Sequence, residues 1–312
     1  GVGLLLGGLL TESLSWEWIF LINVPIGLAT FAATLRIVPE TREPARGFDA
    51  LGAITVTAGL LALVYGIVKA ESFGWTDPRT LGLGAAAFAL FAPLIRLSIF
   101  RIRSVAFANT AAVLVAAALF PLFFFGSLFM QDIKGFSPIE SGVGFLPFTL
   151  GVMTGTTLAQ RSLGRFGART VSLAGLVIAA AGLGYLTALE PGSSYFGAFL
   201  PGIVAMGFGV GNVWLPMTMA ATGNVDAERQ GLASGLVNTS QQIGGALGLA
   251  ILSTIATERA GSLSPGPDAA VEGFTLAFAG GVGFILIALL VLTARLRRED
   301  VDVATAVPAP SH

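Results

Sequence analysis

The side chains best suited to recognising a ligand are three amides inside a long apolar segment. Asn238, Gln241 and Gln242 lie in the segment 231–256. At a step of 100° per residue, one arc of roughly 80° collects a face of glycines and amides. Its members are Gly231, Gly235, Asn238, Gln242 and Gly245. Because amides in an apolar environment need hydrogen-bond partners, they either line a path for a solute or hydrogen-bond between helices. The sequence leaves both possibilities open.

Large apolar side chains offer a second kind of recognition. Pockets for drug-sized molecules are lined mainly by aromatic and aliphatic groups, with few polar ones. The candidates for such a lining, together with the three amides, are Phe125, Phe129, Gln131, Trp214 and Met217. Aromatic groups in apolar segments also pack against one another, so ordinary packing is the alternative for each of them.

Groups that could carry a proton or hold a metal are scarce. Proton transfer needs a titratable group whose burial moves its pKa toward neutrality. Asp132 is the best candidate, because it follows Phe129 and Gln131 at the end of the apolar segment 106–130, and a solvated charge beside Lys134 is the alternative. The chain has no cysteine and a single histidine, His312, so we expect no metal site, no cofactor and no enzymatic activity.

A basic turn at 161–169, with the sequence RSLGRFGAR, carries two arginines that could act as a conformational latch. Arg165 and Arg169 would lie at helix ends, where they could bind unpaired carbonyl groups or the acids Asp226 and Glu228. The alternative is simple retention of positive charge on one side of a membrane.

Long apolar helices must position these side chains. Hydrophobic residues make up 54% of the 312 residues and charged residues 11%, and the mean hydropathy is +0.82. An ordinary soluble domain has about 25% charged residues. Nine segments are near the ~20 residues that a membrane-crossing helix requires: 18–36, 50–68, 80–97, 106–130, 140–160, 168–189, 196–221, 231–256 and 273–294. We therefore expect an all-α polytopic membrane protein, with one further partial helix at 1–10 that indicates the C-terminal part of a longer protein.

Glycines within these segments predict close helix packing, because small side chains let membrane helices approach one another. The relevant sets are Gly151 with Gly155, Gly207 with Gly209 and Gly211, Gly231 with Gly235, and Gly244 with Gly248. We expect most of them to be structural.

The basic residues predict the orientation of the helices. Alternate turns and ends hold 13 of the 17 lysines and arginines, and the other turns hold the remaining 4. Cytoplasmic loops retain lysine and arginine, so the richer side and the C-terminus are expected in the cytoplasm. A net charge of -1 argues against nucleic-acid binding. The polar tail 299–312 is expected to be disordered.

Several runs resemble those of one membrane-protein family. They are GVGLLLGGLL at 1–10, WIFLINVPIG at 18–27, FDALGA at 48–53, LFMQDIKGFSPIESGVGFLP at 128–147 and ERQGLASGLVNTSQQIGGALG at 228–248. Together they resemble the fourteen-helix drug:proton antiporters of the major facilitator superfamily, the EmrB/QacA-type multidrug exporters. Gly3, Gly7 and Gly8 match in part the glycine-rich antiporter motif of that family.

The resemblance implies proton-driven efflux of hydrophobic or cationic drugs by alternating access, in a bacterial inner membrane. It also implies a division of the chain. Residues 1–36 would hold the last one and a half helices of an N-terminal bundle, 37–49 a cytoplasmic linker, 50–98 an inserted pair of linker helices, and 104–298 a C-terminal bundle of six helices. Activity would then require N-terminal helices absent from this chain. An exporter of another solute, such as a lipid, siderophore or amino acid, and an inactive truncated product are the alternatives.

Overall fold

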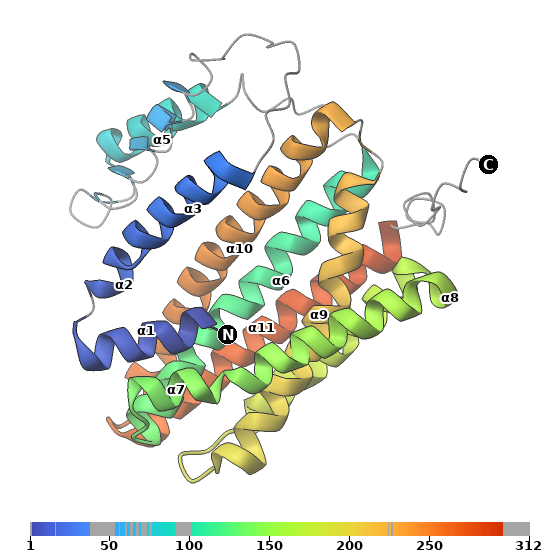
Figure 1. Ribbon diagram of the computed structural model, residues 1–312. Helices are drawn as coiled ribbons and strands as arrows, with labels where there is room; N and C mark the ends of the chain where they lie inside the picture. The colour runs from blue at the N-terminus through green and yellow to red at the C-terminus, as the bar shows by residue number, and fades with distance from the viewer. Residues whose placement is uncertain are drawn as a thin grey trace. The chain divides into compact units, whose positions relative to one another are not determined.

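The computed structural model describes residues 2–15, 17–37, 54–55, 57–59, 61–62, 65–66, 69, 74, 77–91, 102–223, 225 and 227–295 (Figure 1). The chain forms two compact units, one of residues 1–26 with 100–312 and one of residues 27–99. All regular secondary structure in the described ranges is helical. The prediction of an all-α fold is confirmed.

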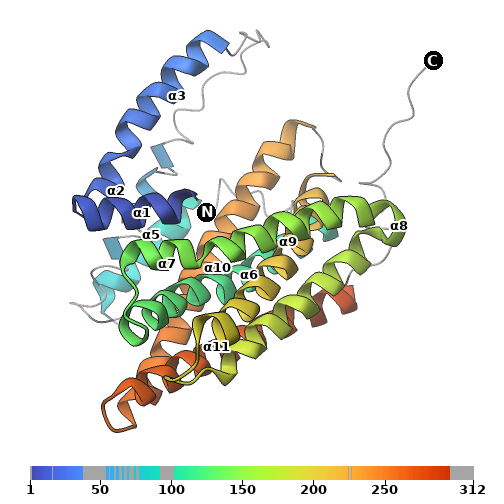
Figure 2. The same cartoon turned by 60° about the horizontal axis from the view of Figure 1, so that its bottom comes forward.

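The first unit contains two short N-terminal helices and a bundle of long ones. Its elements are α1 (Val2–Ser13), α2 (Trp18–Leu21), α6 (Arg103–Leu128), the π-helix η2 (Phe129–Ile133), α7 (Pro138–Gly144), α8 (Leu146–Tyr185), the 3₁₀ turn η3 (Leu186–Ala188), the π-helix η4 (Tyr195–Phe199), α9 (Leu200–Thr222), α10 (Ala227–Gly261) and α11 (Pro267–Arg295). α6 packs against α10 and α11, and α9 packs along α8 (Figure 1 and Figure 2). α3 (Asn23–Ile37) begins in this unit and continues into the second.

The second unit is described mainly through α5 (Pro78–Phe91). The turn before α5 is held by Thr80, whose hydroxyl donates to the carbonyl of Gly74 at 3.0 Å. The predicted linker at 37–49 lies outside the described residues from 38 onward, and so do most of the predicted span 50–68 and the end of the span 80–97.

Five helical stretches in the described part of the chain are long and apolar enough to cross a membrane. They are Trp18–Ile37, Arg103–Ile133, Pro138–Ala188, Tyr195–Thr222 and Pro267–Ala294. The stretch Pro138–Ala188 holds both predicted spans 140–160 and 168–189, because α8 consists of two helices that meet at a kink at Gly167, where the backbone leaves helical geometry with a φ of 75°. α10 covers the predicted span 231–256 as a helix of 35 residues, but its amides and hydroxyl groups keep it below the hydropathy of the other five.

Glycines allow α9 to lie between the two halves of α8. On one side, a Cβ added at Gly155 would lie 2.2 Å from the carbonyl oxygen of Phe208. On the other side, a Cβ added at Gly209 would lie 2.4 Å from the backbone nitrogen of Ala179. Both helix pairs therefore touch through their backbones, as predicted for these glycines.

The glycines of α10 behave differently from one another. Gly244 and Gly248 pack against α6, where an added Cβ would lie 2.2 Å and 2.3 Å from carbonyl oxygens of that helix. Gly231 and Gly235 have nothing within 4 Å of an added Cβ. The prediction of close packing at this second pair is wrong for the described residues, because the α6-facing side of α10 carries Gly244 and Gly248 instead.

Candidate functional site

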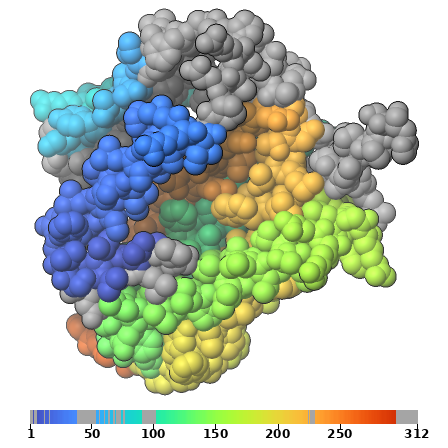
Figure 3. Space-filling view, in the orientation of Figure 1, coloured from blue at the N-terminus to red at the C-terminus, as the bar shows by residue number. Residues whose placement is uncertain are grey.

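A cleft of about 330 Å³ lies within the first unit, between α1, α6 and α7. The space-filling view shows α1 (dark blue) against α7 (green) on this face (Figure 3). The residues that line the cleft are Gly3, Gly7, Gly8, Thr11, Phe123, Ser127, Gln131, Pro138, Ser141, Gly142 and Phe145. Its volume is within the range of ligand pockets, about 300–1,000 Å³.

The wall formed by α7 is fixed by its own local sequence. Gly135, with φ of 70°, allows the chain to reverse after η2. Ser137 then caps α7: its hydroxyl accepts from the backbone N–H of Glu140, and its own N–H donates to the Glu140 carboxylate at 2.8 Å. Pro138 occupies the first helical position, where no backbone donor is needed. These features place the Pro138, Ser141 and Phe145 side of α7 toward the cleft.

The wall formed by α6 ends in a π-helical turn. The N–H of Lys134 donates to the carbonyl of Phe129, five residues earlier, at 3.1 Å. A π-helical turn changes the direction of the side chains that follow it, and such turns are frequent at functional sites. Here Gln131 lines the cleft, where its amide donates to the Ser127 hydroxyl at 2.8 Å, whereas Asp132 is exposed outside the lining.

α1 closes the cleft through residues without long side chains. A Cβ added at Gly8 would lie 2.8 Å from the carbonyl oxygen of Pro138, so α1 and α7 touch there by backbone. Gly3 and Gly7 have nothing within 4 Å of an added Cβ, so their missing side chains leave the cleft open. Thr11 adds a hydroxyl to the lining, which donates to the carbonyl of Gly7 at 2.7 Å.

The lining combines aromatic rings with neutral hydrogen-bonding groups. Phe123 contacts Phe145 and Phe148, with ring centroids 5.1 Å and 5.0 Å apart. Ser141 is 3% exposed, and its hydroxyl has no hydrogen-bond partner among the described residues. None of the lining residues is charged. The cleft can therefore hold an aromatic or apolar molecule and offer it hydrogen bonds, and ring faces can also attract a cation.

Three of the predicted path residues lie in the hydrophobic core instead of the cleft. Phe125 packs against Phe274, with ring centroids 5.5 Å apart, and Phe129 stacks on Phe199 at the same distance. Met217 belongs to a smaller buried cluster with the alanines of α6. These side chains hold the bundle together in the conformation described.

The predicted amides of α10 lie away from the cleft. Asn238 and Gln242 are exposed and Gln241 is half-buried, and the exposed Trp214 of α9 is also outside the lining. The polar link between α6 and α10 comes from a pair that the sequence did not single out. The hydroxyl of Ser240 donates to the side-chain oxygen of the buried Asn109 at 2.8 Å.

The two arginines of the predicted latch have different surroundings. Arg169 donates from Nη2 to the carbonyl of Thr293 at the end of α11, at 2.9 Å. Arg165 is exposed and lies over the ring of Phe166 at 5.3 Å. Asp226 and the side chain of Glu228 lie outside the described residues, so the predicted pairing of these acids with the arginines stays a prediction.

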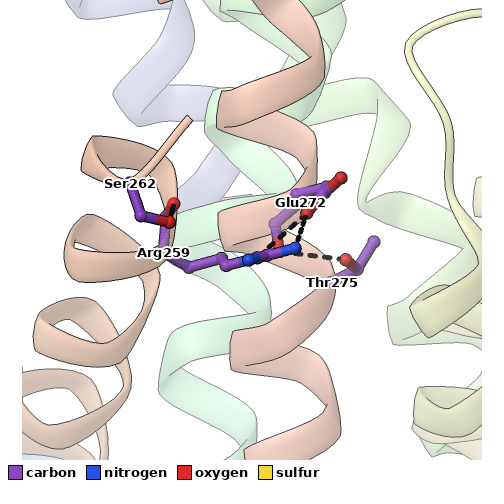
Figure 4. Close-up of polar contacts among 4 residues, drawn as sticks. All are labelled: Arg259, Ser262, Glu272 and Thr275. Atoms are coloured by element: carbon purple, nitrogen blue, oxygen red, sulfur yellow. Dashed lines mark hydrogen bonds and ion pairs between the residues drawn. The ribbon is translucent and has the colours of Figure 1, made fainter. Parts of the chain in front are cut away.

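An ion pair joins α10 to α11 at the opposite end of the bundle from Arg169. Arg259 donates from Nε and Nη2 to one oxygen of Glu272, at 2.9 Å and 2.6 Å (Figure 4). Both side chains are about half exposed. Pairs of this kind contribute little stability, because water and salt screen them.

The amino-acid sequence of the chain is similar to those of a known protein family and of several of its members. The family model described as Major Facilitator Superfamily matches residues 1–249 and 125–311. The chain is 37% identical to a puromycin resistance protein of Streptomyces alboniger over 92% of this chain and 61% of that protein. It is 34% identical to the tetracenomycin C resistance and export protein of Streptomyces glaucescens, over 84% of this chain and 51% of that protein. For the multidrug resistance protein Stp of Mycobacterium tuberculosis the identity is also 34%, over 85% of this chain and 52% of that protein.

The chain thus spans between half and about three fifths of the length of these relatives. Its apolar helices and its similarity to membrane exporters identify a multi-pass membrane protein. The family model covers almost the whole chain. The chain therefore belongs to the Major Facilitator Superfamily.

Proposed function

We propose that this chain takes part in the export of hydrophobic or cationic small molecules, including antibiotics, across the bacterial inner membrane. The cleft between α1, α6 and α7 is the observation that carries the proposal, because its aromatic and neutral polar lining suits such molecules. The relatives named for puromycin, tetracenomycin C and multidrug resistance support the same class of substrate. The substrate packs against the rings of Phe123 and Phe145 and hydrogen-bonds to Gln131 and Ser141.

The proposal includes inward proton movement as the driving force and alternating access as the mechanism. The proposal also includes the division of the chain into an inserted helix pair at 50–98 and a six-helix bundle at 104–298. It places the C-terminus in the cytoplasm, because the turns on that side hold 13 of the 17 basic residues and the turns on the other side hold 4. Asp132 remains the proposed proton carrier of this chain. Asn238 and Gln242 remain a second proposed contact with substrate, on the exposed side of α10.

In the proposed cycle, Arg169 stabilises one conformer through the end of α11. A guanidinium at the C-terminal end of a helix satisfies carbonyl groups that lack helical partners. The observed bond to Thr293 provides such a contact. Arg165 remains a proposed second member of this latch, with Asp226 and Glu228 as its proposed partners.

A space-filling substitution tests the cleft as the binding site. Gly7→Leu adds a side chain that meets no atom near its Cβ, yet it fills the cleft. We expect it to weaken the binding of ethidium and puromycin by at least about tenfold, as the loss of one apolar pocket would. Gly283→Leu on α11 is the matched control, because an added Cβ there also has nothing within 4 Å and the position is outside the cleft.

The measurement is a fluorescence titration of ethidium, with puromycin as competitor, on the purified chain in lipid nanodiscs. Efflux of ethidium from cells, with and without an uncoupler, tests the transport step and its coupling to protons separately. Equal affinity in the Gly7→Leu and Gly283→Leu variants would remove the cleft from the proposal, and efflux that is insensitive to the uncoupler would remove proton coupling.

A further inference from the structure

A second pocket, of about 420 Å³, lies on the side of α7 opposite to the cleft. At 100° per residue, Pro138, Ser141 and Phe145 occupy the cleft side of α7, and Ile139 and Val143 occupy the reverse side. We call this second pocket the lateral groove. The short helix α7 is thus a wall shared by the lateral groove and the cleft.

Each of the two polar side chains of the lateral groove, Tyr195 and Glu140, makes a hydrogen bond within the protein. The hydroxyl of Tyr195 donates to the carbonyl of Gly144 at 2.8 Å. The carboxylate of Glu140 accepts from the backbone N–H of Ser137 at 2.8 Å. The rest of the lining is apolar or aromatic. Because most of the lining cannot form hydrogen bonds, an apolar occupant fits the groove better than a polar one.

Aromatic rings form the end of the lateral groove. The ring of Tyr195 lies 5.7 Å from that of Phe136 and 5.1 Å from that of Phe196. Tyr195 and Pro138 begin two of the apolar stretches that are long enough to cross a membrane, and the groove extends from there to Pro147 and Leu200. The groove therefore starts where the spans begin, at the depth where aromatic side chains gather in membrane proteins, and follows the helices inward.

Some side chains that line the lateral groove are large, apolar and exposed. Val143 is 48% exposed and Phe196 is 76% exposed. Farther along α8, Leu150 and Met153 are 60% and 61% exposed. In a multi-pass membrane protein, large apolar side chains on the outside of a bundle face hydrocarbon. Val143 and Phe196 belong both to this surface and to the lining of the groove.

We propose that the lateral groove binds one acyl chain of a membrane phospholipid. A flexible hydrocarbon chain matches the apolar lining, the aromatic end and the direction of the groove along the helices. The turn between η2 and α7, which belongs to the side poor in basic residues, assigns this lipid to the outer leaflet. The proposal rests on the membrane embedding of the chain and, for the choice of leaflet, on the proposed cytoplasmic C-terminus. It does not depend on drug export.

Native mass spectrometry of the delipidated full chain in detergent tests the proposal, with dioleoyl phosphatidylglycerol as the probe. Val143→Trp fills the groove and should weaken retention of one lipid by at least about tenfold. Val177→Trp is the matched control, because Val177 on α8 is exposed to a similar degree as Val143 and lies outside the groove. Dioleoyl phosphatidylcholine should be retained as well as phosphatidylglycerol, because the chain and not the headgroup is recognised.

A second substitution keeps the test valid if Val143→Trp fails to fold. Phe196→Ala removes one wall of the groove at an exposed position and should also weaken lipid retention. Phe166→Ala should not, because Phe166 is exposed beside the Gly167 kink of α8 and lies outside the groove. Retention that is unchanged by the groove variants, or that follows the headgroup, would overturn the proposal. So would displacement of the lipid by ethidium, which would make the groove a drug site.

Discussion

Replacing Gly155 by alanine is expected to push α8 and α9 apart. The added Cβ would lie 2.2 Å from the carbonyl oxygen of Phe208, and ordinary contact begins at 3.4 Å, so the helices must separate locally by about 3.4 − 2.2 = 1.2 Å. The oxygen belongs to the backbone of a helix, so it cannot move aside as a flexible side chain could. The separation would also loosen the neighbouring contacts of Gly151 and Gly211.

Overfilling a packed interior costs about 1–3 kcal/mol. Alanine recovers roughly 0.5–1 kcal/mol relative to glycine, because it loses less backbone entropy in a helix. We therefore expect Gly155→Ala to lower the free energy of unfolding by about 1–2 kcal/mol. For a folded unit of this size, that corresponds to a decrease in Tm of roughly 2–8 °C.

Gly164→Ala provides the matched control on the same helix. An added Cβ at Gly164 has nothing within 4 Å, so only the entropic gain remains and Tm should stay equal or rise. Thermal unfolding of both variants in detergent, followed by circular dichroism, gives the comparison. A Tm for Gly155→Ala that equals that of Gly164→Ala would refute backbone contact between α8 and α9.

Three other substitutions test the polar contacts of the bundle. Ser240→Ala leaves the side-chain amide oxygen of buried Asn109 without its partner and should lower the free energy of unfolding by about 0.6–1.7 kcal/mol, as for hydrogen bonds between membrane helices, measured by thermal unfolding. Arg259→Gln breaks the exposed pair with Glu272 and should change stability by less than about 1 kcal/mol, with an even smaller difference at high salt. Arg169→Ala should increase hydrogen exchange in the last turn of α11, at a cost of about 1 kcal/mol.

Two controls separate these contacts from general effects of substitution. Ser253→Ala removes a hydroxyl that donates to a carbonyl of its own helix, so it should leave the packing of α10 on α6 unchanged. Arg165→Ala removes a guanidinium whose contact among the described residues is with the ring of Phe166. Losses from the controls as large as those from Ser240→Ala and Arg169→Ala would contradict the importance of the two bonds between helices.

The lengths of the helices could be predicted from the sequence because the bilayer sets them. α9 with η4 runs from Tyr195 to Thr222, close to the predicted 196–221. α11 begins at Pro267, six residues before the predicted start at 273, because residues outside the apolar run can also be helical. Hydropathy marks only the part of a helix that lies in hydrocarbon, so it does not predict where the polar ends of a helix begin or stop.

The pairing of helices could be predicted only in part. Closely spaced glycines permit close approach but do not say which helix approaches, so Gly244 with Gly248 and Gly231 with Gly235 looked equivalent in the sequence. In the structure only the first pair contacts α6. Which face of α10 is covered depends on the arrangement of the neighbouring helices, and a single helix does not encode that arrangement.

Some of the residues that line the cleft could be predicted from the sequence as candidates for a functional role. Gln131 and the three glycines of α1 had been singled out, and all four line it. Thr11 and Ser141 were missed, because hydroxyl groups in membrane helices commonly donate to their own helix, as Thr11 does. The π-helical turn that separates the directions of Gln131 and Asp132 has no signature in a pattern based on 3.6 residues per turn.

The proposed binding of substrate in the cleft can be tested most directly by cysteine protection. The chain has no cysteine, so Thr11→Cys introduces a single reactive thiol into the lining. Ser262→Cys places one on an exposed turn outside the cleft as the control. We predict that saturating ethidium slows the reaction of a water-soluble maleimide with Thr11→Cys severalfold and leaves Ser262→Cys unchanged. Equal rates at Thr11→Cys with and without bound ethidium would contradict the proposal that this cleft holds the substrate.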